Sequence, residues 1–507
     1  MKESNYISDV LQRLKDLGYK PLDQEYYKYI YEWLEWYKGY VDTFHKRTMY
    51  NGIKYCSDDV ASLGLAKIFS QHWASLLFNN KTAVTMEEDD AESQNVLDEL
   101  FKDTNFRHYF KNTLEVTFAT GTGATTEYLE DGEIRVNHIY APMIFPLKQI
   151  NGEIVDCAFA SIDGEGYYLN IHERNKDGSY TITNDWFMTS NLNNKVSTTT
   201  VDKEGVVKKY TSPVKLFQIY KPNQVNAIDL YCPMGMAITA TCIDQFKTAD
   251  YAFDTLRNEF KLGKKKIFLP IGTLSYKILS NVDGTSQSIP IFDENQTEYY
   301  ALPGDEESPT QITEYNPQLR ITELEEGIQL AVNLAGMKAG FGENHFTFKN
   351  GNVYTNTAQV FSSNSDLRYN LMLHEDMLSA SLKELAKALF YLKTGKVYEG
   401  QITINFDDSI FEDEQAKKNN SILELNNDLI DNVQYYIDIY GMTEKQAIEF
   451  DKKIRERKAK SEETEEPTQE EVDEEDNEPT EEQEDSSKED ESDKEDKESS
   501  NDEVEKE

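Results

Sequence analysis

The chain has 507 residues, with 52 Lys and Arg against 93 Asp and Glu, and a formal net charge of −41. Proteins that coat DNA concentrate Lys and Arg to neutralise phosphates, so this charge excludes that class. The length predicts several domain-sized units, although a subunit of a large assembly can reach this size as one body.

More than half of the negative charge lies in the last 47 residues. Residues 461–507 hold 26 acids and 4 lysines, a net of −22, and no aromatic residue. Residues 1–460 are left with 67 acids and 48 bases, a net of −19. The last segment cannot bury enough apolar surface to offset the entropy cost of ordering it. We therefore predict a disordered, acidic C-terminal tail after residue 460.

Targeting and redox signals are few. The four cysteines show no CxxC spacing, which fits a reduced intracellular setting better than a disulfide scaffold. Residues 1–20 lack the basic and then apolar stretches of a signal peptide. No window approaches 18 uncharged apolar residues, so we expect no membrane contact.

The first half of the chain changes from helical to β patterning. Apolar residues recur at helical spacing in four segments: 7–17, 27–37, 66–78 and 93–110. Gly121-Thr-Gly123 then marks a switch to short strands, which continue to Lys221 and are separated by Asp-Gly and Asn-Gly turns.

Two long helices are predicted in the second half, one opening at Pro233 and ending near Leu262, the other at 321–338. A Pro-rich, extended or β-rich insert at 264–320 separates them. Glycines at 340, 342 and 351 break the chain before a helical run at 357–392. A strand at 400–405 and helices at 420–459 follow. Because helices and strands are grouped instead of alternating, the fold class is α+β.

Enzyme and metal motifs give no support. Gly121-Thr-Gly123 lacks the lysine of a phosphate loop, and Gly263 with its lysines fails the spacing, so turns between a helix and a strand explain both. None of the seven histidines forms an HxH or HExxH pair. An acidic run could hold Mg²⁺ or Ca²⁺ but lacks the EF-hand pattern, which favours a solvated turn. That run is Asp407, Asp408, Glu412, Asp413 and Glu414. We expect no enzyme activity, no metal and no cofactor.

A series of motifs carries the specific signal. In chain order they begin with YEWLEWYKGY (31–40), Phe44-His45, IDL (228–230), PMGMA (233–237), IDQFKTADYAFD (243–254) and RNEFKLGKKK (257–266). They continue with YNPQLR (315–320), GFGEN (340–344), TNTAQV (355–360), NSD (364–366) and FDDSI (406–410). In this order the chain resembles the portal proteins of tailed double-stranded DNA bacteriophages, of the siphophage type found in Gram-positive hosts. At Tyr354–Thr357 the sequence lacks the family's usual lysine, and the tail lies outside the family pattern.

The resemblance implies the architecture of a portal subunit. Residues 1–232 would form the wing, 233–262 and 321–339 the two stem helices, and 263–320 the β-rich clip. Residues 340–385 would hold the tunnel loop and a further wing helix, 386–460 the helical crown, and 461–507 the tail. Two amphipathic stem helices must cover their apolar stripes, either on each other as a hairpin or also on neighbouring subunits. The residues alone leave both arrangements open.

The resemblance also implies candidate contacts with DNA. Lys338, His345 and Lys349 would face the duplex from the tunnel loop, whereas the residues taken without the resemblance favour an exposed loop with incidental charge. Lys264, Lys265 and Lys266 would bind phosphate at the clip edge or complement the helix C-terminus. A conduit must not retain DNA, so we expect an acidic channel, with stem candidates Asp244, Asp250, Asp254 and Glu259.

Partners follow from the same resemblance. We expect a homo-oligomeric ring of twelve subunits, which passes double-stranded DNA without reading its sequence during packaging and ejection. The ring would dock the terminase, head-completion or adaptor proteins, the major capsid protein and the scaffolding protein. It would be assembled in the host cytoplasm and reside at the capsid vertex of the virion. The alternative is a non-viral acidic scaffold or adaptor protein whose tail binds basic partners.

Overall fold

The computed structural model describes most of the chain and divides it into two compact units, residues 1–417 and 418–507. The described residues are 2–50, 54–87, 91–130, 132–163, 166–192, 195–200, 208–270, 276–280, 286–290, 298–302, 313–342, 345–347, 365–406, 414–427, 429–442 and 444–462. The predicted disordered tail lies outside them, except for two residues that end a helix.

Helices form most of the first 120 residues, as expected. They are α1 (Lys2–Asp16), α2 (Gln24–Lys38), α3 (Asp42–His45), α4 (Leu65–Leu77), α5 (Ala91–Asp103) and α6 (Phe106–Thr120). The bounds of α2 have local causes: the Asp23 side chain accepts a hydrogen bond from the Glu25 amide, and Gly39 ends the helix with φ of 81°.

The single helix predicted over residues 93–110 is two helices. Asn105, between α5 and α6, has φ of 49°, a left-handed conformation that interrupts the helix. Phe101 before the break and Phe106 after it are buried in one core and stack with ring centroids 5.0 Å apart. The apolar pattern therefore continues across the break, so the spacing of apolar residues does not reveal where the helix is interrupted.

β structure begins at Gly123. A three-stranded sheet has the order β12-β4-β5, and a larger antiparallel sheet has the order β10-β9-β8-β7-β6, with β11 paired to β9. Their bounds are β4 (Gly123–Glu130), β5 (Glu133–Tyr140), β6 (Ile144–Ile150), β7 (Glu153–Asp163), β8 (Gly166–Arg174), β9 (Tyr180–Leu192), β10 (Lys195–Thr200), β11 (Lys209–Ser212) and β12 (Phe217–Tyr220). Two smaller pairs are β1 (Thr48–Tyr50) with β2 (Tyr55–Ser57), and β3 (Ala83–Thr85) with β18 (Thr403–Asn405).

The first long helix, α7 (Ile243–Leu262), starts ten residues later than predicted, after a 3-10 turn at Ala240–Cys242. Residues 233–239 are a loop whose backbone groups are bonded to side chains and, at Ile238, to the Phe118 carbonyl of α6. Gln224 donates to the carbonyls of residues 236 and 237, and the Thr122 hydroxyl accepts from the amide of Gly235. Pro233 and Gly235 thus belong to a packed loop that precedes the helix.

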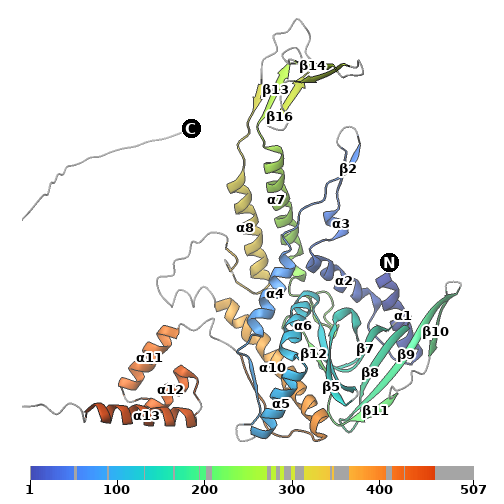
Figure 1. Ribbon diagram of the computed structural model, residues 1–507. Helices are drawn as coiled ribbons and strands as arrows, with labels where there is room; N and C mark the ends of the chain where they lie inside the picture. Colours follow the sequence, from blue (N-terminus) through green and yellow to red (C-terminus); the bar gives the residue numbers. More distant parts are fainter. Residues whose placement is uncertain are drawn as a thin grey trace, which may run out of the picture. The chain divides into compact units, whose positions relative to one another are not determined.

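The second long helix, α8 (Ile321–Lys338), lies beside α7 in Figure 1, and the Pro-rich insert joins their far ends. The insert is β-rich as predicted. Its strands are β13 (Lys266–Pro270), β14 (Tyr276–Ser280), β15 (Ser286–Pro290), β16 (Glu298–Leu302) and β17 (Thr313–Tyr315). β13 pairs with β16 in parallel and with β17 antiparallel, and β14 pairs with β15.

The helix α10 (Ser365–Thr394) closes the core of the first unit. Its buried stripe repeats every three or four residues, at Leu367, Leu371, His374, Leu378, Leu382, Leu385 and Leu389. The boundary predicted at residue 386 therefore falls inside one continuous helix. One apolar cluster joins α4, α5, α6, α7, α8 and α10, and a second joins α1 and α2 to the large sheet.

The second unit is helical in its described part, with α12 (Asn432–Tyr440), α13 (Glu444–Glu462) and most of α11 (Glu414–Asn426). Searched over the described residues, the structure has no helix that is long and apolar enough to span a membrane. The grouping of helices and strands makes the chain α+β, as predicted.

Candidate nucleic-acid interface

Those predicted DNA-contacting residues that the structure describes lie on or next to α7 and α8, which we call the helical pair. α8 buries small residues against its surroundings, including Ala331 and Ala335, so the two helices approach closely. Polar contacts join the helices at both ends. Arg320 donates to Glu259 at the far end, and Lys338 donates to the Thr241 carbonyl at 3.0 Å at the near end.

Lys338, predicted to face DNA, directs its ammonium group to hydrogen-bond acceptors at the start of the neighbouring helix α7. Its Nζ also donates to Oε1 of Gln245 at 2.9 Å, while the side chain stays exposed. The lysine therefore joins α8 to the start of α7. Lys349, predicted to act beside it, lies outside the described residues.

His345 lies in an aromatic cluster next to α4. Its ring stacks on Phe341 with centroids 5.2 Å apart, and its Nε2 is 2.9 Å from Nε2 of His72. Burial, and then the neighbouring His72, lower the pKa of His345 to about 4. Burial also lowers the pKa of His72. The imidazole of His345 is therefore uncharged at neutral pH, so a contact with DNA here would not be an ion pair.

The segment that leaves α8 is anchored to the core before it reaches residue 343. Gly340 and Gly342 have φ of 87° and 82°, which lets the chain reverse direction directly after the helix. Trp73 on α4 donates its indole N–H to the Ala339 carbonyl, and Asn370 on α10 donates to the Gly340 carbonyl. The predicted tunnel loop thus starts from a fixed point.

The three clip-edge lysines follow α7 directly. Lys264 is exposed, and Lys265 forms an exposed ion pair with Glu314 at 2.6 Å. Lys266 begins β13 and is half-buried. Gly263, which ends α7, donates its amide to the Glu259 carbonyl, so these lysines lie next to the helix C-terminus, where positive charge is favourable.

Asp250, predicted to face the channel, is buried with 2% of its surface exposed. It accepts hydrogen bonds from the Leu63 amide at 2.7 Å and from the Ser62 hydroxyl at 3.1 Å. His45, fully buried, lies with Nε2 3.1 Å from the carboxylate. Because Nδ1 of His45 accepts from the Val41 amide, its Nε2 carries the proton and donates to Asp250.

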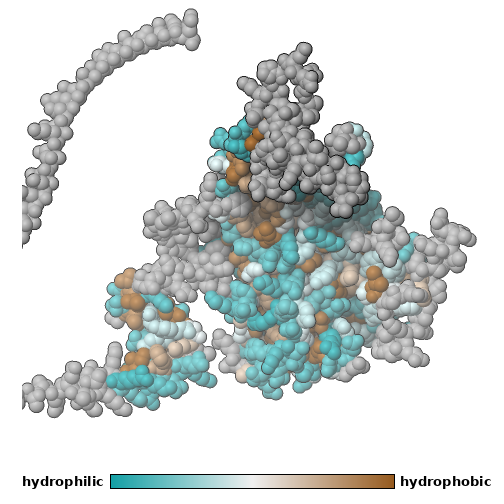
Figure 2. Space-filling view, turned by 45° about the horizontal axis from the view of Figure 1, so that its top comes forward, coloured by the Kyte–Doolittle hydropathy of each residue, from teal (hydrophilic) through white to brown (hydrophobic). Residues whose placement is uncertain are grey.

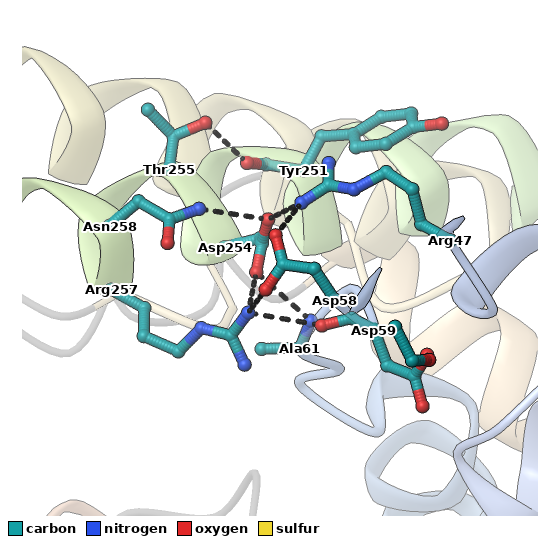
Figure 3. A network of polar contacts seen from close by, with 10 residues as sticks. Arg47, Asp58, Asp59, Ala61, Tyr251, Asp254, Thr255, Arg257 and Asn258 are labelled. Atoms are coloured by element: carbon teal, nitrogen blue, oxygen red, sulfur yellow. Dashed lines mark hydrogen bonds and ion pairs between the residues drawn. The ribbon is translucent and has the colours of Figure 1, made fainter. Parts of the chain in front are cut away.

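Asp254, also predicted to face the channel, is 3% exposed and lies at the centre of a charged network (Figure 3). Arg257 donates to it at 2.6 Å, and Arg47 donates both to it and to Asp58. The hydrogen bond from Arg47 lowers the pKa of Asp58. Two guanidinium groups thus balance two carboxylates between α7 and residues 41–64. Contrary to prediction, Asp250 and Asp254 are not exposed acids, because this segment covers them.

The other two stem acids remain accessible to different degrees. Asp244 is exposed near the start of α7, 3.5 Å from Lys247. Glu259 is largely covered by Arg320, and its side chain is 16% exposed. The helical pair therefore presents fewer free carboxylates than the sequence suggested.

His45, Arg47 and Asp58 were not predicted as functional residues. Phe246, Asp250 and Asp254 are spaced i, i+4 and i+8, which places both acids on the same side of α7 as a buried phenylalanine. That spacing is a sequence signal for buried acids that need partners. It does not identify His45 and Arg47, which lie 205 and 207 residues away along the chain from the acids they contact.

In the described part of the chain, no group of three or more His, Cys, Asp or Glu side chains could hold a metal ion. The acidic run at 407–413 lies outside the described residues, and Glu414 starts α11.

Comparison with protein families gives a match over most of the chain. The family described as "Phage portal protein, SPP1 Gp6-like" matches residues 19–496. The chain belongs to this phage portal family. It is therefore a component of the portal vertex of a phage, and a role in DNA packaging follows from that position. Proteins of this family are in general structural and not enzymes.

Known proteins outside the family comparison add little. No curated protein is similar enough in sequence to match. Two solved structures align with this chain. They are the neck of a native gene transfer agent particle, computed with C12 symmetry, and the virion of a native gene transfer agent particle. The alignments cover 73% and 75% of this chain and 87% and 88% of those chains, each at 10% identity and a TM-score of 0.39.

Proposed function

We propose that this portal protein forms a closed ring around a channel that conducts double-stranded DNA. One surface of α8 supports the proposal most directly. We call it the outward face of α8, and it consists of Glu323, Glu326, Leu330, Leu334 and Met337. Its three apolar side chains are 61%, 43% and 54% exposed. Contiguous exposed apolar surface of this kind marks a protein interface.

Further exposed apolar residues lie elsewhere on the first unit. Tyr369 and Met372 on α10 are exposed, as are Leu230 and Tyr231 in the loop before α7. Figure 2 shows brown hydrophobic patches within a mainly teal hydrophilic surface on the side in view. Copies arranged head to tail cover such surfaces and close into a ring when the rotation allows. We propose twelve copies.

The parts of the chain would have separate roles in that ring. The helical pair would form the stem, and the described strands between residues 266 and 315 would form the clip that docks the terminase and, later, the head-completion proteins. Residues before α7 and the helix α10 would form the wing. The helices after residue 414 would form the crown, with the acidic tail beyond it.

DNA would pass through without being held or read. Lys338 is hydrogen-bonded within the chain and His345 is uncharged at neutral pH, so neither offers a strong phosphate contact. Asp244 is exposed, and we retain it and Glu259 as candidates for the acidic channel wall. Weak, sequence-independent contacts leave the duplex free to slide, since few counterions are released on binding.

In a cell this protein would be assembled in the host cytoplasm together with scaffolding and major capsid proteins, and would remain at one vertex of the virion. A siphophage of a Gram-positive host fits the motif order. The alternative of a non-viral acidic scaffold is not favoured, because the portal family match spans residues 19–496.

Negative-stain electron microscopy of the purified full chain tests the proposal. We expect rings with a central hole, and a mass by light scattering that corresponds to twelve subunits. A gel-shift assay with two unrelated linear duplexes should show equally weak binding to both. A protein that stays monomeric at tens of micromolar, or that binds one duplex sequence selectively, would contradict the proposed function.

A further inference from the structure

Both strands of the hairpin of β1 and β2 have solvent-exposed side chains. We call residues 46–59 the arm, of which 46–50 and 54–59 are described. Tyr50 pairs with Tyr55 across the hairpin, with ring centroids 5.2 Å apart, and the two side chains are 59% and 76% exposed. A two-stranded hairpin is marginally stable by itself, so an exposed aromatic pair on it points to an external partner.

Contacts between the base of the arm and α7 set the direction in which the arm runs along that helix. Arg47 and Asp58 join the network around Asp254, and Arg257 donates to the Asp59 carbonyl. Residues 61–63 contact α7 at Asp250 and Asp254, whereas residue 59 contacts it at Arg257. The arm therefore runs toward the C-terminal end of α7.

The arm and the outward face of α8 lie on opposite sides of the helical pair. α7 meets the arm through Asp250, Asp254 and Arg257, and meets α8 through Gln245 and Glu259. At 100° per residue, these two sides of α7 are about 170° apart. The residues of the outward face span an arc of about 80°, centred about 170° from the buried side of α8. Figure 1 shows the same order, with β2 on one side of α7 and α8 on the other.

The two sides also match in chemistry at each level along the helices. At the level of Tyr251, the Phe44 ring before the arm contacts the Tyr251 ring with centroids 4.9 Å apart, and Tyr251 and Tyr40 are 50% and 40% exposed. α8 runs antiparallel to α7, so Leu330 and Leu334 lie at that level on the other side. Both surfaces are apolar there.

Nearer the far end the two sides carry opposite charge. Lys54 is the one charged residue in the sequence from Thr48 to Ser57. The outward face of α8 presents Glu323 and Glu326 in that half of the helix. When the arm side and the outward face of α8 are aligned along the helix axis, apolar residues of one therefore lie opposite apolar residues of the other. In the same alignment, one base lies opposite two acids.

We propose that the arm side of one subunit packs on the outward face of α8 in the next copy of this chain. Tyr40 and Tyr251 cover Leu330 and Leu334, and Lys54 lies near the two glutamates. Because different surfaces meet, the contact is head to tail and repeats around a ring. The inference rests on the proposed ring and identifies which surfaces build it.

Photocrosslinking maps the contact directly. p-Benzoylphenylalanine at Tyr55, in full-length protein assembled from isotopically light and heavy subunits, should give mixed-label crosslinks to residues 321–338. The same probe at Leu129, which is 57% exposed on β4, is the control and should not reach that helix. Crosslinks from residue 55 that map only outside 321–338 would overturn the inference.

Charge exchange tests the register. Lys54→Glu and Glu326→Lys should each raise the concentration needed for half-maximal ring assembly about tenfold, and the double variant should return it to near the wild-type value. Leu334→Glu should prevent rings at concentrations where Leu129→Glu, an exposed control on β4, still forms them. Additive single effects, or rings that tolerate Leu334→Glu, would refute the proposed contact.

The microscopy separates the two proposals. If wild-type protein forms no rings, the proposed function fails. If it forms rings while residue 55 crosslinks elsewhere and Leu334→Glu assembles normally, the function stands and this interface is wrong.

Discussion

Replacing Asp250 by alanine tests whether the buried contacts between α7 and residues 41–64 stabilise the fold. The carboxylate accepts from three donors: Nε2 of His45, the Ser62 hydroxyl and the Leu63 amide. The alanine variant leaves the His45 and Leu63 N–H groups without this acceptor, whereas the hydroxyl can rotate.

The expected loss can be estimated from those two groups. An N–H group that is buried and left without an acceptor costs about 1–3 kcal/mol. Removing a buried carboxylate also relieves its desolvation cost, which offsets part of the loss. We therefore expect Asp250→Ala to lower the free energy of unfolding by about 3 kcal/mol. Asp250→Asn keeps one acceptor and should lose less, which provides a folded variant if alanine prevents folding.

Urea unfolding followed by tryptophan fluorescence measures the effect, with Trp36 close to the site at 5.5 Å from the His45 ring. Asp244→Ala, an exposed change on the same helix, is the control and should leave the midpoint unchanged. In a double-mutant cycle, His45→Ala and Asp250→Ala together should cost less than the sum of the single changes. Equal midpoints for the Asp250 and Asp244 variants, or strictly additive losses, would refute the reasoning.

Three further predictions concern other parts of the first unit. The pKa of His345 is lowered in the folded chain, so the stability that the neutral His345 contributes is complete above its unfolded pKa near 6.5 and is lost as the pH falls toward about 4. His345→Gln should therefore reduce the drop in urea midpoint between pH 7.5 and 4.5. His108→Gln, at an exposed site, should not reduce that drop. Burial raises the pKa of Glu127 to about 7, so the ionised Glu127 increasingly lowers the free energy of unfolding as the pH rises above 4.5. In the same unfolding assay, Glu127→Gln should be more stable than wild type at pH 8, by at most about 3 kcal/mol, and equally stable at pH 4. Gly121→Ala should yield little soluble protein, because φ is 84° and a Cβ would overlap the Gly235 carbonyl; Gly18→Ala, with φ of 92° in open space, should lose only about 1–2 kcal/mol and remain soluble.

Much of the fold could be predicted from local patterns. The apolar spacing in α2, α4 and α8, the switch to strands at Gly123 and the β-rich insert all follow from side-chain periodicity and turn residues. Two errors have the same origin. Asn105 breaks a helix although the apolar pattern continues, and Gly235 belongs to a packed loop although it was predicted to lie in a helix. In both cases a backbone conformation or a distant hydrogen bond outweighs local propensity.

By itself, the sequence determined the family, the order of the elements and the location of the charge, because each of these is encoded by residues close together in the chain. The tertiary structure decided which charges are available. Asp250 and Asp254 are acids on a helix in either description, but only the fold places His45 and Arg47 against them and removes both from solvent. Likewise, only the fold turns Lys338 onto the Thr241 carbonyl and pairs His345 with His72. These partners are separated by up to 273 residues, and burial and charge pairing depend on distance in space, which local sequence does not specify.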